Sequence, residues 1–218
     1  SPAVKPNQPG IQVINDYDLE ALTEFIDWTP FFISWQLSGK FPDILKDEVV
    51  GTEAQKLYND ARSMLRQIID EKWLTAKAIF GLFPANAIGD ESIAVYEDES
   101  RSTPTHVLHF LRQQRQKAPG QPNLSLSDYI RKPEDGPDYI GAFAVTAGVG
   151  IEEHVKRFEA DHDDYNAILL KALADRLAEA LAEQLHLRVR KEFWGYAQEE
   201  TLQNDALIAE KYQGIRPA

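Results

Sequence analysis

The feature that most constrains the fold is one long stretch of helix-forming residues, Asp161 to Lys191. It contains no glycine and no proline, and it is rich in Ala, Leu, Glu, Lys and Arg, which have the highest helix propensities. Acidic residues gather at its start and basic residues at its end, an arrangement that complements the helix dipole. The sequence therefore predicts one helix of about 45 Å, at 1.5 Å per residue, against which the remaining chain must pack.

One face of this predicted helix is apolar. The residues that fall on it at successive i+4 steps are Tyr165, Leu169, Leu173, Leu177, Leu181 and Leu185. Asp175, Glu179 and His186 fall together on a different face when each residue advances by about 100°. The spacing favours a core helix with a solvated acidic strip, and the spacing by itself gives no reason to place Glu179 in a ligand cleft.

Composition excludes several classes of protein. A chain of 218 residues can bury one substantial core, and none of its apolar runs has the length of a transmembrane helix. The absence of cysteine excludes a disulfide framework, thiolate zinc sites and cysteine nucleophiles, and no secretion signal is evident, so we expect a cytoplasmic protein. The formal net charge of −12 argues against general nucleic-acid binding, which needs clustered Lys and Arg.

The first part of the chain predicts an arm followed by helices. Residues 1–18 contain three prolines and a glycine and are interpreted as a linker or arm, leaving residues 19–218 as the domain. An amphipathic segment from Asp18 to Ile26 follows. Thr52 to Gln55 has a capping-box pattern and is predicted to begin a helix that extends to about Lys72.

Short apolar runs predict a sheet. The predicted strands are Ala78–Phe83, Ser92–Tyr96, Thr105–Leu111 and Tyr139–Thr146. Pro84 is expected to end the first of them, and the last is expected to be central because it is apolar throughout. Further helices are predicted at Ser125–Ile130, Ile151–Ala160 and Leu202–Tyr212. Helices and strands together predict an α+β fold.

Two motifs resemble known sites without matching them. Gly148-Val149-Gly150 follows a strand and precedes a helix, but the third glycine of a dinucleotide loop would fall at Glu153, so a turn is expected. Asp161, Asp163 and Asp164 could serve a metal-dependent hydrolase, with His154 nearby. Because adjacent residues cannot all face one ion, and acids at a helix start are ordinary caps, this hydrolase is the weakest alternative.

Six blocks of residues, in this order, carry a resemblance to one family. They are Asp27-Trp28-Thr29-Pro30-Phe31-Phe32, Gly81-Leu82-Phe83-Pro84-Ala85-Asn86, Tyr139 to Thr146, His162-Asp163-Asp164-Tyr165-Asn166, Lys171 to Ala180, and Gly214-Ile215-Arg216-Pro217-Ala218. The chain closely resembles the C-terminal activation domain of cobalamin-dependent methionine synthase. The resemblance covers nearly everything after the first 18 residues.

The resemblance implies both a fold and a function. It implies a helmet-like α+β domain with a twisted antiparallel sheet and long helices, and it implies binding of S-adenosylmethionine. The parent methyltransferase moves a methyl group from methyltetrahydrofolate to homocysteine through cobalamin. When the cobalt oxidises, the activation domain docks on the cobalamin-binding domain of the same enzyme, flavodoxin or a similar reductase supplies an electron, and S-adenosylmethionine supplies a methyl group.

The resemblance also implies a set of ligand-binding residues. Asp27, Glu179 and Arg216 match family positions at the S-adenosylmethionine cleft, and Ala218 lies beside Arg216 in the sequence. No side chain is expected to act as a nucleophile or general base. The family motif continues beyond the last residue, Ala218, so we expect this 218-residue chain to bind S-adenosylmethionine weakly or not at all and to be inactive by itself.

A second function is an interaction module that docks on a cobalamin domain and a flavoprotein without binding a ligand of its own. Its candidate contacts to an acidic electron donor are Arg112, Arg115, Lys117, Arg188, Arg190 and Lys191.

Overall fold

The computed structural model describes residues 3–214, without the side chains of residues 204 and 205. The chain divides into two compact units. Unit 1 consists of Ser1–Gln12, Ile79–Phe143 and Arg188–Glu200, and unit 2 of Val13–Ala78, Ala144–Leu187 and Thr201–Ala218.

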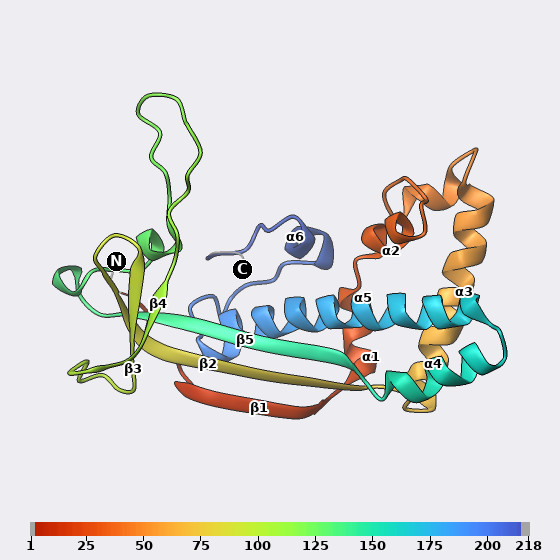
Figure 1. Cartoon of the computed structure of the whole chain (residues 1–218), viewed down its shortest axis with the longest axis horizontal. Helices are drawn as coiled ribbons and strands as arrows, with labels where there is room; N and C mark the ends of the chain where they lie inside the picture. Colours follow the sequence, from red (N-terminus) through yellow and green to blue (C-terminus); the bar gives the residue numbers. More distant parts are fainter. Residues whose placement is uncertain (1–2, 215–218) are drawn as a thin grey trace. The chain divides into compact units, whose positions relative to one another are not determined.

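The strands form one five-stranded sheet within the described part of the chain (Figure 1). They are β1 Gly10–Tyr17, β2 Thr75–Ile88, β3 Ser92–Tyr96, β4 Pro104–His109 and β5 Asp138–Val149. Because β2 pairs with β1, β3 and β5, it is the central strand. The prediction of a central β5 was wrong: among the described strands β5 pairs with β2 alone, and Ala142 and Ala144 are exposed.

Strand β2 is longer than predicted. It continues through Pro84, which is buried within it. The fixed φ of proline, about −65°, is compatible with extended backbone, so Pro84 does not end the strand. Beyond it, β2 and β3 form an antiparallel hairpin from the Ala85↔Val95 pair to the Ile88↔Ser92 pair.

Much of the N-terminal segment interpreted as a linker or arm is ordered. Residues Gly10–Tyr17 form β1. Before this strand, Gln8 N donates to the carbonyl oxygen of Phe193 at 2.9 Å, and Trp194 Nε1 donates to the carbonyl oxygen of Val4 at 2.8 Å. Composition could not predict this order, because the partners of these residues lie far away in the sequence.

The helices are mostly in unit 2. The α-helices are α1 Leu19–Leu22, α2 Trp28–Ser34, α3 Gly51–Asp70, α4 Ile151–Ala160, α5 Asp164–Arg188 and α6 Asn204–Ile208. The 3₁₀ turns are η1 Thr23–Phe25, η2 Asp43–Lys46, η3 Leu126–Tyr129 and η4 Pro133–Asp135, and a π-helical segment, η5, covers Val189–Phe193. Among residues 3–214, no helix combines the length and the apolar character that a transmembrane span requires.

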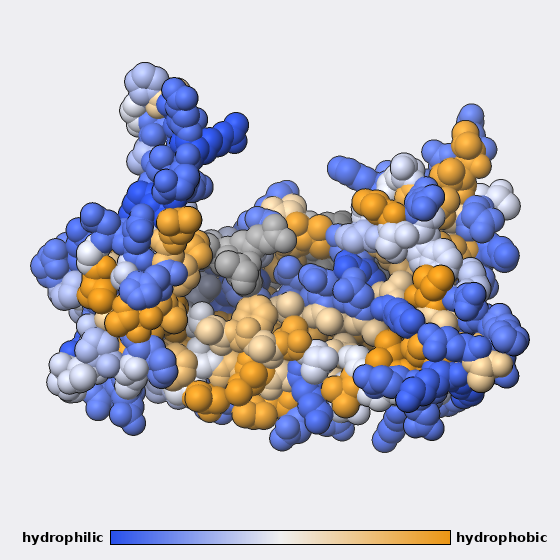
Figure 2. Space-filling view, viewed as in Figure 1, coloured by the Kyte–Doolittle hydropathy of each residue, from blue (hydrophilic) through white to orange (hydrophobic). Residues whose placement is uncertain are grey.

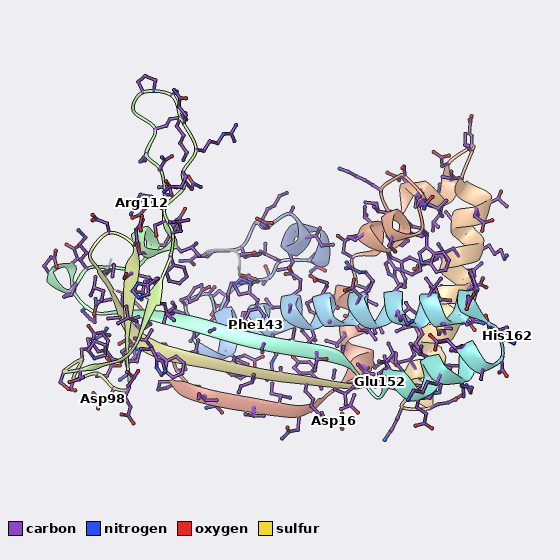
Figure 3. The ribbon with its side chains drawn as sticks, viewed as in Figure 1. Asp16, Asp98, Arg112, Phe143, Glu152 and His162 are labelled. Atoms are coloured by element: carbon purple, nitrogen blue, oxygen red, sulfur yellow. The ribbon has the colours of Figure 1, made fainter. Side chains whose placement is uncertain are left out.

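The long helix differs from its prediction at both ends. It begins at Asp164 rather than Asp161, because a turn at His162, with φ of 57°, separates it from α4 (Figure 3). Asp163 caps the new start by accepting from Asn166 N at 3.0 Å. Beyond Arg188 the helix passes into the π-helical segment that ends at Phe193.

The predicted apolar face is confirmed for the leucines. Leu169, Leu173, Leu177, Leu181 and Leu185 are each 1% exposed or less, whereas Tyr165 is 39% exposed.

Two further local predictions differ from the structure. The prediction of a capping box at Thr52 was wrong, because α3 begins one residue earlier and Asp47 instead accepts from Val49 N and Val50 N at 2.8 and 2.9 Å. The predicted helix over residues 202–212 is α-helical only at Asn204–Ile208. Ser125 does form a capping box, at the start of η3.

The turn predicted at Gly148-Val149-Gly150 is confined to Gly150, because Gly148 and Val149 are the last residues of β5. Gly150 precedes α4 with φ of 100°, and a Cβ there would lie 2.8 Å from the carbonyl oxygen of Trp73. Gly148, by contrast, has its nearest such contact at 4.0 Å, to Ala174 Cβ. The turn therefore needs glycine at position 150 but not at position 148.

We expect Gly150→Ala to lower the free energy of unfolding by about 2 kcal/mol or more, since it combines backbone strain with a backbone clash. The matched control, Gly148→Ala, should change it by less than about 1 kcal/mol. Urea unfolding followed by circular dichroism measures both. Equal effects of the two variants would contradict this account of the turn.

A buried ion pair lies in the last segment of unit 1, Arg188–Glu200. Arg190 is fully buried, and its guanidinium donates from Nε and Nη2 to the two carboxylate oxygens of Glu200, at 3.0 and 2.6 Å. The Glu200 side chain is 7% exposed. Because a buried charge without its partner is strongly destabilising, this pair fixes the segment that follows the π-helical turn. Arg190 is therefore not the surface contact that the sequence predicted.

Glu200→Ala should lower the free energy of unfolding by about 3–5 kcal/mol, because it leaves the Arg190 charge buried. The exposed neighbour Glu199 provides the control, and Glu199→Ala should have an effect within about 0.5 kcal/mol. The measurement is the urea midpoint at constant m-value. A Glu200→Ala midpoint equal to that of the control would overturn the role given to this pair.

Candidate ligand-binding site

The segment Ala21–Trp35 and helix α5 lie side by side in unit 2, running in opposite directions. Gln184 Nε2 donates to the carbonyl oxygen of Ala21 at 3.3 Å, and the Trp35 ring lies 5.2 Å from the ring of Tyr165. In the sequence, Asp27 lies between these two contacts on the segment, and Glu179 lies between them on the helix. The segment that carries Asp27 thus contacts the helix that carries Glu179 at two points, near Ala21 and at Trp35.

Asp27 is the N-cap of α2. Its backbone is extended, with φ of −81° and ψ of 110°, and Oδ1 accepts from Thr29 N at 3.0 Å. Aspartate is a preferred residue at this position, because its carboxylate satisfies an N–H group that the helix leaves open. Among residues 3–214, Oδ2 has no recorded partner, so this oxygen remains available to a cationic or hydroxyl group.

Glu179 is exposed on α5, between positions whose leucines are buried. No partner for its carboxylate is recorded among residues 3–214. Asp175, one turn earlier, is instead paired with Arg176 at 2.6 Å. The predicted solvated strip is confirmed for these two acids. His186 is the exception, because it is 8% exposed and contacts the Tyr212 ring at 5.0 Å.

Arg216 and Ala218 lie outside the described residues. The structure therefore gives no position for these two predicted ligand residues.

Two polar groups that the sequence did not indicate lie on these same backbones. Trp35 Nε1 and Gln184 Oε1 are buried and have no hydrogen-bond partner among the described residues. A buried polar atom without a partner costs about 1–3 kcal/mol, so both are natural positions for contact with a ligand or with further chain. The sequence could have indicated Gln184, because it is a polar residue directly beside the row of leucines that the helix buries.

The acidic cluster considered for a metal has other roles. Residues 3–214 contain no group of three His, Asp or Glu side chains placed to hold a metal ion. Asp163 caps α5, and His154 stacks on Trp73 with ring centroids 4.5 Å apart. The metal-dependent hydrolase thus has no ligand cluster in this part of the chain.

The family model described as vitamin B12 dependent methionine synthase, activation domain, matches residues 18–218. The chain belongs to this family. It is also similar to a solved structure described as the MetH reactivation domain bound to AdoHcy, with 52% identity and a TM-score of 0.95. The similarity covers 100% of this chain and 66% of that one.

These findings confirm the family resemblance and the α+β fold predicted from the sequence. The helices accompany a sheet whose β2–β3 and β3–β4 pairs are antiparallel. The chain spans about two thirds of the length of the similar structure.

Tyr165 connects the start of α5 to α3 beside this site. Its hydroxyl donates to Asp60 Oδ2 at 2.8 Å. Burial, and then the hydrogen bond to the Asp60 carboxylate, raise the pKa of Tyr165 to about 12 from 10.0. Both causes favour the protonated phenol over the phenolate.

The stability of the folded chain should therefore fall as pH rises from about 10 to about 12. In this window an unfolded tyrosine loses its proton while folded Tyr165 keeps it. Ionisation therefore stabilises the unfolded state and lowers the free energy of unfolding. Tyr165→Phe should lose this part of the pH dependence, as measured by urea unfolding at pH 9, 10 and 11. Asp60→Asn should lower the pKa only in part, because burial is the larger cause. Identical slopes for wild type and Tyr165→Phe would contradict the assignment.

Proposed function

We propose that the chain is the S-adenosylmethionine-binding reactivation module of a cobalamin-dependent methionine synthase, and that it supports reductive remethylation of cob(II)alamin in methionine biosynthesis. The observation that carries this proposal is the similarity, at 52% identity and a TM-score of 0.95, to a solved structure of a reactivation domain bound to AdoHcy. AdoHcy is S-adenosylmethionine after loss of its methyl group. The contacts of the Asp27-bearing segment Ala21–Trp35 with α5, the helix that carries Glu179, support a ligand site in unit 2.

The proposed ligand residues suit the chemistry of S-adenosylmethionine. The free oxygen of Asp27 and the carboxylate of Glu179 suit its ammonium group, its ribose hydroxyls and its sulfonium charge. Arg216 would grip the ligand carboxylate with two parallel hydrogen bonds, a geometry that the guanidinium group favours. Ala218, beside it, is proposed to line the same site.

The residues of this chain bind and orient the methyl donor, and none of them needs to act as a nucleophile or general base. Cobalamin, held by the neighbouring domain of the same enzyme, supplies the metal centre that accepts the methyl group. Flavodoxin or a comparable reductase supplies one electron. In this proposal the domain includes β1, Gly10–Tyr17, in addition to residues 19–218, and the enzyme is cytoplasmic.

A second candidate function is docking alone. Because the chain covers 66% of the similar reactivation-domain chain, the 218 residues by themselves could contact the cobalamin domain and the reductase while binding little S-adenosylmethionine and having no activity of their own. Isothermal titration of this chain with S-adenosylmethionine separates the two functions, since micromolar binding would exclude the second.

Asp27→Asn should weaken binding of S-adenosylmethionine by about tenfold to 100-fold, the effect of losing one hydrogen bond to a charged group. Asparagine caps helices as well as aspartate does, so the stability of the domain should be retained. The test is isothermal titration of the complete enzyme with S-adenosylmethionine and with AdoHcy.

The control for this experiment is Asp18→Asn. Asp18 is also an N-cap carboxylate, and it accepts from Glu20 N at 3.0 Å at the start of α1. Its substitution should leave the dissociation constant unchanged. Equal constants for wild type and Asp27→Asn, with both proteins folded, would remove Asp27 from the proposed site.

Glu179→Gln should weaken binding without a measurable change in the urea midpoint, because Glu179 is exposed and unpaired among the described residues. A variant that binds like wild type would show that this carboxylate faces solvent in the complex as well.

A further inference from the structure

Strand β4, Pro104–His109, forms an open edge of the sheet in unit 1. It pairs with β3, and it has no second partner among the described strands. Every residue of the strand is exposed. The open edge of a strand presents unpaired N–H and C=O groups, which form a template for pairing with another chain.

The unpaired backbone groups of this edge belong to Val107 and His109. Just beyond the strand, Phe110 N donates to the carbonyl oxygen of Glu91 at 2.7 Å, in register with the β3–β4 ladder. Along an antiparallel strand, residues that exchange hydrogen bonds with the neighbouring strand alternate with residues whose groups face away from it. Because Phe110 faces the ladder, Val107 and His109 turn their N–H and C=O groups outward.

The middle of this edge lacks the features that protect open edges in native proteins, which are charged side chains, proline and bulges. β4 contains no Asp, Glu, Lys or Arg, and its proline and the irregularity in its pairing both lie at its start. Val107 and Leu108, on opposite faces of the strand, are 41% and 38% exposed. Figure 2 shows hydrophobic residues gathered over this part of unit 1. The outer edge around Val107 is therefore uncharged and open to a second strand.

An acidic turn, Glu97-Asp98-Glu99, precedes β4. Glu99 is paired with Lys5 and Arg101, at 3.1 and 3.5 Å. Glu97 and Asp98 are exposed and have no cationic partner recorded among residues 3–214. The turn therefore carries free negative charge at the start of the strand.

A basic loop, residues 111–124, follows β4. It carries Arg112, Arg115 and Lys117 and contains no acidic residue. The loop extends away from β3 and β4 (Figure 1), and Asp98 and Arg112 lie at opposite ends of β4 (Figure 3). One uncharged strand is thus placed between an acidic turn and a basic loop.

Arg112 does not contribute free charge, contrary to the contact role predicted from the sequence. Its guanidinium donates to both carboxylate oxygens of Asp128, at 2.6 and 2.8 Å, and the charges of Glu91 and Asp90 also act on it. Arg112 correspondingly lowers the pKa of Asp128 to about 2. The foot of the loop is therefore occupied by contacts within unit 1.

The free positive charge of the loop lies farther out, at Arg115 and Lys117. Arg115 is exposed, with no recorded partner among residues 3–214. Lys117 Nζ donates to two neutral oxygen atoms of the loop, Gln113 Oε1 at 2.5 Å and the carbonyl oxygen of Pro122 at 2.7 Å. These contacts order the loop before any partner arrives, which lowers the entropy lost on association.

We propose that β4 is a self-association surface, at which the β4 strands of two copies of this chain pair antiparallel about a two-fold axis. Such an axis requires one patch to be complementary to itself. Antiparallel pairing places the acidic turn of each copy beside the basic loop of the other, so Glu97 and Asp98 approach Arg115 and Lys117 twice in the dimer. A parallel pair would bring like charges together at both ends. This inference goes beyond the proposed function and does not depend on it.

The first experiment compares wild type with Val107→Lys by sedimentation equilibrium of the 218-residue chain over a range of concentrations. Wild type should approach twice the mass of one copy. Val107→Lys sets like charges against each other across the two-fold axis, so the dimer dissociation constant should rise by about tenfold or more. The control is Val49→Lys, at a residue outside the sheet that is 90% exposed, and it should associate like wild type. Circular dichroism checks that each variant is folded.

The second experiment reverses the charge at each end of the strand. Glu97→Lys/Asp98→Lys and Arg115→Glu/Lys117→Glu should each weaken association, because each protein alone then has like charges at both contacts of the dimer. An equimolar mixture of the two variants should associate again, because opposite charges meet at both contacts between unlike copies. Restoration by mixing cannot result from disorder that the loss of Lys117 causes in the loop.

A wild-type chain that stays monomeric at every concentration would overturn the proposal. Equal dissociation constants for wild type and Val107→Lys would overturn it as well. A mixture of the two charge-reversed variants that associates no better than either variant alone would overturn the antiparallel arrangement.

Discussion

The site in unit 2 depends on the burial of one row of leucines along α5. Leu169, Leu173, Leu177, Leu181 and Leu185 are almost completely buried, and burying each such side chain contributes about 1.5–3 kcal/mol. Rotation of the helix by even one residue would expose the whole row. The row therefore fixes the helix about its axis, which keeps Glu179 on the exposed side and holds Tyr165 and Gln184 against the segment that carries Asp27.

Elements of the fold that depend on residues close together in the sequence were predictable. Elements that depend on residues far apart in the sequence were not. The leucine row, α4 and β3 follow from local periodicity and occur as predicted. The order of residues 3–17 depends on partners such as Phe193 and Trp194, which no local pattern reveals. The prediction that β5 is central failed because its alanines are apolar but small, and an apolar residue is often exposed. The apparent capping box at Thr52 does not form, because α3 begins at Gly51 and Thr52 already lies within the helix.

The candidate site was predictable to a different extent for each residue. The capping role of Asp27 follows from aspartate before Trp-Thr-Pro, but an N-cap carboxylate looks the same in a sequence whether or not it also contacts a ligand. Glu179 is indistinguishable by spacing from any solvated acid of a core helix. Their ligand roles came from the family resemblance alone, and the structure adds that the segment carrying Asp27 contacts the helix carrying Glu179 near Ala21 and at Trp35. Trp35 could be found only from the burial of its indole nitrogen.

The two carboxylates differ in how far the fold orients them in advance. Asp27 is held by its hydrogen bond to Thr29 N, so its second oxygen points in a fixed direction before any ligand arrives. Glu179 is exposed and makes no recorded contact among residues 3–214, and ordering a long glutamate side chain costs up to about 1.5–2 kcal/mol. A ligand contact of equal strength would therefore yield more net affinity at Asp27, where the capping interaction has already reduced the conformational freedom of the side chain.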